Sequence, residues 1–177
     1  MISCLLRRFR EPAMNDETLD FQKARASALR LLKVRPRSVA ELRARLARKE
    51  FPQPVVEEVL AFLRGLGYLD DLSFANAWVR SRMNTRPRSR RSLKRELRQK
   101  GVDGGIIEQA VGAVDEDTEW DTCLSLACKR SERVRGLAPE KQRLRVAAFL
   151  QRRGYSTGLI IQALTYIKNH EKLRDSK

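Results

Sequence analysis

Apolar residues recur along this chain at intervals of three and four positions, the spacing that gathers side chains on one face of an α-helix. The strict alternation of apolar and polar residues that is typical of half-buried β-strands is missing. The pattern therefore predicts an all-α protein.

Capping residues and chain breakers divide the pattern into nine predicted helices, grouped in threes. Ser38 and Glu41 form a capping box, and Asp103 stands where the sixth helix needs an N-cap. Either Ser156 or Thr157 caps the ninth helix. We predict three-helix units at 18–68, 69–115 and 116–171, with disordered ends at 1–17 and 172–177.

The second and third helices of each unit repeat the same apolar pattern. Seven positions are apolar in all three copies, which indicates tandem units that bury equivalent faces. Stacked units of this kind form an elongated, curved rod, and we expect that shape here. The first copy of the pattern has Leu42, Leu46, Val55, Val56, Val59, Leu60 and Leu63; the second has Leu93, Leu97, Ile106, Ile107, Ala110, Val111 and Val114; the third has Val146, Leu150, Leu159, Ile160, Ala163, Leu164 and Ile167.

The corner between the paired helices carries glycine in two copies, at Gly101 and Gly154. Glycine adopts the left-handed conformation of a helix C-cap without steric cost. The first copy has Glu50 at this place, so we expect a different or a strained corner there.

The formal net charge of +15 indicates a polyanionic partner, most often nucleic acid. Residues 80–100 hold ten basic side chains against one acid, Glu96. At about 100° per residue, the basic residues of the fifth helix form a stripe opposite its buried leucines. A second basic cluster lies on the eighth helix. Arginine predominates, which suits forked contacts with phosphate or carboxylate.

Sequence motifs for catalysis or metal binding are not found. The stretch "GVDGG" lacks the lysine and hydroxyl of a phosphate-binding loop, and we predict no cofactor, no metal site and no enzymatic activity. Cys4, Cys123 and Cys128 make an odd set, which favours core thiols in a reducing compartment. With no stretch long enough to span a bilayer, we expect a cytoplasmic protein that does not bind membranes. Residues 1–13, ahead of Met14, are expected to be disordered or a start-site artefact.

The stretches "GYLDDLSFANAWV" and "RELRQKG", together with "RPRSVAELRARL" and "FLQRRGY", resemble the RecX family over residues 20–170. That resemblance implies three tandem three-helix units and no catalytic residues. It also implies binding along the groove of the RecA–DNA filament, with altered filament assembly, ATP hydrolysis, strand exchange and repressor cleavage, most often inhibition. Glu50 departs from the family, which favours glycine there, and "TRPRSRR" is richer in arginine than usual.

We therefore expect a monomer that contacts RecA and both single- and double-stranded DNA, largely without sequence preference. A sequence-specific helix-turn-helix transcription factor is the main alternative, although arginines suit phosphates better than base edges. An RNA-binding protein would interleave aromatic residues with the basic stripe, whereas Tyr68, Phe74 and Trp78 occupy core-like positions. The predicted RecA- and DNA-binding surface consists of Arg86, Arg88, Arg91, Lys94, Arg95, Arg98, Lys141, Arg145, Arg152 and Arg153.

Overall fold

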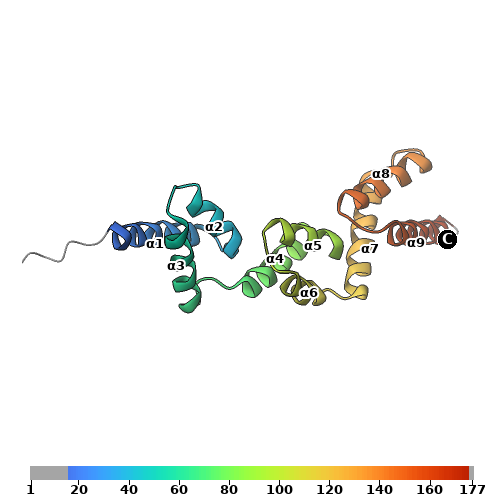
Figure 1. Cartoon of the computed structure of the whole chain (residues 1–177). Coiled ribbons are helices and arrows are strands. Elements are labelled where there is room, and N and C mark those ends of the chain that lie inside the picture. The colour runs from blue at the N-terminus through green and yellow to red at the C-terminus, as the bar shows by residue number, and fades with distance from the viewer. Residues whose placement is uncertain (1–15, 176–177) are drawn as a thin grey trace, which may run out of the picture. The chain divides into compact units, whose positions relative to one another are not determined.

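The computed structural model describes residues 16–175, and their side chains over 18–170. Within that part of the chain every regular element is an α-helix, which confirms the predicted all-α class (Figure 1). Nine helices are present there, as predicted: α1 (Asp16–Val34), α2 (Val39–Ala47), α3 (Gln53–Gly65), α4 (Asp71–Thr85), α5 (Arg90–Gln99), α6 (Gly104–Gly112), α7 (Glu116–Arg133), α8 (Pro139–Arg152) and α9 (Thr157–Asp175).

The terminal predictions fall partly outside the described residues. Cys4, Met14 and the ends 1–15 and 176–177 are not described, so the expectations for them stay predictions. Helix α1 begins two residues before the predicted first unit, and α9 continues to Asp175, four residues past the predicted end of the third.

Each consecutive triplet of helices packs around an apolar core of its own. The seven repeated apolar positions are buried or half-buried in all three copies. The repeated pattern in the sequence therefore corresponds to three equivalent cores. The chain divides between Leu69 and Asp70 into two compact units: the first holds α1–α3, and the second holds α4–α9.

The predicted caps are present at the helix ends. The Ser38 hydroxyl accepts a hydrogen bond from the Glu41 N–H at 3.1 Å, and the Asp103 carboxylate accepts one from the Gly105 N–H at 2.8 Å. At α9, the Ser156 hydroxyl accepts from the Leu159 N–H, which settles the cap in favour of Ser156. Each cap satisfies an N–H that the helix leaves unpaired, which defines where that helix begins.

The corner between the paired helices has the same left-handed backbone in all three triplets. The φ angle is 61° at Glu50, 71° at Gly101 and 86° at Gly154. The first corner is therefore not a different turn but the same turn made by a residue with a side chain, at a cost of about 1 kcal/mol or more. The strained alternative of the prediction is confirmed.

One predicted core position is wrong. Tyr68 is 61% exposed, because the left-handed Gly67 turns the chain so that Leu69 enters the core in its place. Phe74 is buried as predicted, and Trp78 is half-buried against it.

The two described cysteines, Cys123 and Cys128, both lie on α7. Cys123 is buried, and burial raises the pKa of its thiol to about 11, so the group is neutral and unreactive at pH 7. Cys128 is half-buried. Over the described residues, no cluster of metal-ligating side chains occurs and none of the helices could span a membrane.

Candidate nucleic-acid interface

Helix α5 places its basic residues on the side away from the core. The Ser89 hydroxyl caps the helix by accepting from the Ser92 N–H at 3.2 Å. Ser92, Leu93 and Leu97 form the buried face of the helix. Any cation on the opposite side of this short helix is therefore directed toward solvent.

Arg91, Arg95 and Arg98 occupy that opposite side, and we call them the α5 row. At about 100° per residue they fall within an arc of about 60°, and they rise about 10 Å along the helix. All three side chains are exposed, and none of them forms an ion pair with another described residue. Their guanidinium groups therefore keep their donors available for an external anion.

Lys94 lies beside the row but is already paired. It is half-buried, and its Nζ contacts the carboxylate of Glu108 on α6. That hydrogen bond, with smaller contributions from the charges of Lys94, Arg98 and Arg90, lowers the pKa of Glu108. Lys94 is therefore held in place at pH 7 with its charge largely neutralised.

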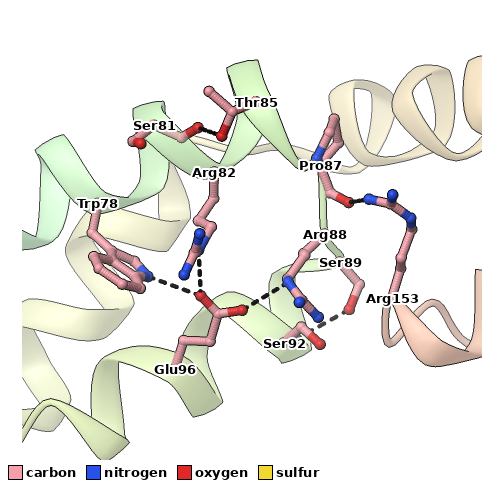
Figure 2. A network of polar contacts seen from close by, with 10 residues as sticks. All are labelled: Trp78, Ser81, Arg82, Thr85, Pro87, Arg88, Ser89, Ser92, Glu96 and Arg153. Atoms are coloured by element: carbon pink, nitrogen blue, oxygen red, sulfur yellow. Dashed lines mark hydrogen bonds and ion pairs between the residues drawn. The ribbon is translucent and has the colours of Figure 1, made fainter.

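Glu96, the one acid of the basic stretch, ties three side chains together (Figure 2). Its carboxylate accepts from the Trp78 indole N–H at 3.0 Å and from Arg82 at 2.7 Å, and it pairs with Arg88 at 2.8 Å. Arg82 also stacks over the Trp78 ring at 4.3 Å. This Glu96 network fastens α4 to α5 on the flank of the second core.

Arg88 and Arg153 belonged to the predicted binding surface, and the structure engages both inside the protein. Arg88 is held by Glu96, and Arg153 donates to the carbonyl oxygen of Pro87 at 2.7 Å (Figure 2). The Arg153 guanidinium also covers the Phe149 ring at 4.6 Å. Burial lowers the pKa of Arg153, and the neighbouring charges of Arg88 and Arg86 lower it further. Arg86 itself is exposed.

The contacts of Arg153 belong to a junction between the second and third helical triplets. The Ser89 N–H donates to the Arg153 carbonyl at 3.1 Å, and the Arg90 N–H donates to the Glu119 carboxylate at 2.8 Å. A Cβ atom on Gly154 would lie 2.3 Å from the Ser92 hydroxyl oxygen, so only glycine fits. The start of α5 is therefore seated directly on the corner between α8 and α9.

Helix α8 carries a second exposed basic row, formed by Lys141, Arg145 and Arg152. By the helical period these residues share one face, opposite the buried Val146 and Leu150. None of the three pairs with a carboxylate of the described side chains.

An open groove lies at the junction, between α5 and the α8–α9 corner. Reasoning from the sequence missed it, because Arg90, Glu119 and Ser156 meet only through the packing of the two triplets. The pattern within a single helix carries no signal for such a meeting. The lining residues are Arg90, Arg91, Lys94, Arg98, Glu119, Gly154, Ser156 and Leu159.

Comparison with known protein families assigns all three triplets. Models described as the first, second and third three-helix domains of RecX match residues 24–63, 70–111 and 117–164. The chain belongs to the RecX family. The predicted membership is thus confirmed, and with it the organisation into three three-helix units.

The relatives of this chain compared below carry the name regulatory protein RecX. The protein from Streptomyces coelicolor is 39% identical over 143 residues, covering 81% of this chain and 76% of the relative. That from Thermobifida fusca is 42% identical over 139 residues, covering 78% and 75%. That from Amycolatopsis mediterranei is 39% identical over 155 residues, covering 88% and 86%.

Solved structures support the same fold. The crystal structure of RecX from Lactobacillus salivarius is similar to this chain with a TM-score of 0.74 at 23% identity, covering 84% of this chain and 97% of the other. A second crystal structure of a regulatory protein RecX gives a TM-score of 0.72 at 25% identity, covering 81% and 72%.

Proposed function

We propose that this member of the RecX family regulates the RecA recombinase, mainly as an inhibitor, by binding along the groove of the RecA–DNA filament. In this proposal it modulates filament assembly, ATP hydrolysis, strand exchange and repressor cleavage, acting as a cytoplasmic monomer. It contacts RecA as well as single- and double-stranded DNA, largely without sequence preference. No catalytic role is proposed.

The observation that carries the proposal is the α5 row. Three exposed arginines without internal ion pairs repel one another, and such an arrangement becomes favourable when an external polyanion neutralises it. A nucleoprotein filament offers phosphates and acidic side chains along its groove. The row on α8 supplies further cations of the same kind in the same compact unit.

The proposal is tested by charge reversal on α5. Arg91, Lys94, Arg95 and Arg98 are replaced together by glutamate, and inhibition of RecA ATPase on single-stranded DNA is titrated with the protein. We expect the concentration for half-inhibition to rise by at least about ten-fold, since several phosphate or carboxylate contacts become repulsive. Unchanged inhibition would reject the assignment.

A matched control carries the same change in charge elsewhere. Four basic residues of the first triplet have exposed side chains and no ion pair with a described residue, and their reversal should shift half-inhibition by less than about two-fold. Circular dichroism of both proteins checks that the helices are retained. An equal loss in both would mean that net charge, rather than the α5 surface, governs inhibition. The control positions are Lys33, Arg45, Arg48 and Arg64.

A further inference from the structure

The groove at the junction of the second and third triplets concentrates positive charge. One wall is α5, with Arg90, Arg91, Lys94 and Arg98. The only acid among the lining residues is Glu119, and it is occupied as the acceptor of the Arg90 backbone N–H at 2.8 Å. Because Lys94 pairs with Glu108, the three arginines are the cations left without an ion pair among the described residues.

The opposite wall is the corner between α8 and α9. The Ser156 hydroxyl accepts the Leu159 N–H at 3.3 Å as the cap of α9, and it still has its own hydrogen to donate. This wall therefore adds one neutral donor, the Ser156 hydroxyl, to a groove that the arginines of α5 line on the other side.

The two walls are held at a fixed separation. Gly154 packs so closely on Ser92 that a Cβ atom has no room, and the Ser89 N–H is bonded to the Arg153 carbonyl. Arg153 also reaches across to the Pro87 carbonyl at 2.7 Å. The backbone of the two walls therefore does not have to rearrange when a ligand binds, which reduces the entropy lost on binding.

We propose that this groove binds a backbone phosphate of a DNA strand, an assignment that rests on the proposed function at the filament. A phosphodiester carries one negative charge shared by two oxygens, and these oxygens can accept hydrogen bonds from the arginines of one wall and the hydroxyl of the other. Because every nucleotide adds a phosphate, the strand then continues along the α5 row to Arg95. An isolated acidic side chain brings one charge and no successor, so it would leave the remaining cations of the groove and of the α5 row unpaired.

The test introduces one negative charge without disturbing the cap. Asp is as good an N-cap as Ser, so Ser156→Asp keeps α9 while placing a carboxylate in the groove. Ser73→Asp is the matched control, since Ser73 is exposed in the first turn of α4 and does not line the groove. Binding of a labelled single-stranded oligonucleotide is measured without RecA, over a range of about 50 to 200 mM salt.

Ser156→Asp is expected to weaken binding at least about five-fold, and to reduce the slope of log K against log salt by about one. Ser73→Asp should stay within about two-fold of the unsubstituted protein. Equal affinities for the two variants would overturn the assignment, as would polyglutamate competing as well as DNA of the same charge.

The two proposals fail in distinguishable ways. If Ser156→Asp weakens DNA binding but the unsubstituted protein does not affect RecA ATPase, the phosphate site in the groove is supported and the function at the filament is rejected. If the protein inhibits RecA but Ser156→Asp leaves its DNA binding unchanged, the function at the filament is supported and the phosphate site in the groove is rejected. Arg98→Gln, which removes a cation from the facing wall, gives an independent second variant, and it too is expected to lower the salt slope.

Discussion

Two sets of arginines share the same unit of this protein but act in different ways. Arg82, Arg88 and Arg153 hold the fold, because each has a carboxylate or carbonyl acceptor between 2.7 and 2.8 Å away. Arg91, Arg95 and Arg98 do not hold it: they are exposed and have no acidic partner in the described structure.

The difference shows that neighbours in space, not residue type or place in the sequence, decide what an arginine contributes. A partly buried arginine with an acceptor stabilises the fold, and the donor that it uses there is not available to a ligand. An exposed arginine adds little stability and some repulsion, and it keeps five donors for a ligand. The basic residues that the sequence analysis assigned to one binding surface therefore fall into two groups, one that stabilises the fold and one that is available to a ligand.

The largest effect on stability is expected when Arg82 and Arg88 lose their shared acceptor, Glu96. Glu96→Ala removes the partner of Trp78, Arg82 and Arg88 and leaves two half-buried cations side by side. We expect the free energy of unfolding to fall by about 2 to 4 kcal/mol, measured by urea denaturation. Glu58→Ala, at an exposed glutamate of α3, is the control and should change stability by less than about 0.5 kcal/mol. Equal losses would contradict the comparison.

The junction that positions Arg153 gives the next effect. Gly154→Ala forces a Cβ atom against the Ser92 and Ser89 hydroxyls and places a side chain at a φ of 86°, so we expect a loss of about 2 kcal/mol. Adding Ser92→Ala removes the nearest oxygen and should restore part of that loss. A double-mutant cycle measures the coupling. Additive effects would show that the two residues are not in contact.

Two adjacent arginines provide the sharpest single comparison. Arg153→Ala loses the bond to Pro87 and the stack on Phe149, and should lower the free energy of unfolding by about 1 to 2 kcal/mol. Arg152→Ala, one residue earlier and exposed, should lower it by less than about 0.5 kcal/mol. Thermal unfolding of the two variants in parallel checks this. A larger loss of stability for Arg152→Ala than for Arg153→Ala would contradict the distinction between the two arginines.

The smallest effect is expected when Lys94, which lies beside the α5 row, loses its acidic partner. Glu108→Gln releases Lys94 from its partner and adds a free charge beside the α5 row. Because Lys94 lowers the pKa of Glu108, both members of the pair are charged at pH 7. The substitution therefore removes one negative charge at this pH. We expect affinity for single-stranded DNA to rise about two-fold, with a steeper salt dependence. Weaker binding would mean that Glu108 itself supports the surface.

The elements and cores were predictable because their causes are local. The capping box of Ser38 and Glu41, and the repeated pattern of Leu42, Leu93 and Val146, fix helix starts and buried faces within a few residues of sequence. The left-handed strain at Glu50 followed from comparison with the two glycines. The prediction that Tyr68 is buried was wrong, because the left-handed turn at Gly67 follows the end of α3 and places Leu69 in the core instead.

The site was only partly predictable, because pairing is a tertiary property. The helical period gave the exposed face of Arg91, Arg95 and Arg98. It could not show that Arg153 reaches Pro87, which lies 66 residues away in the sequence. Nor could it show the groove, whose walls come from two triplets.

The most direct test is the affinity of two variants for RecA filaments assembled on single-stranded DNA. Replacing Arg91, Arg95 and Arg98 together by alanine should weaken binding at least ten-fold while the free energy of unfolding stays within about 0.5 kcal/mol. Arg82→Ala should do the opposite, lowering stability while the folded protein keeps its affinity. Filament affinity that survives loss of the row, or that falls with Arg82 instead, would contradict the account.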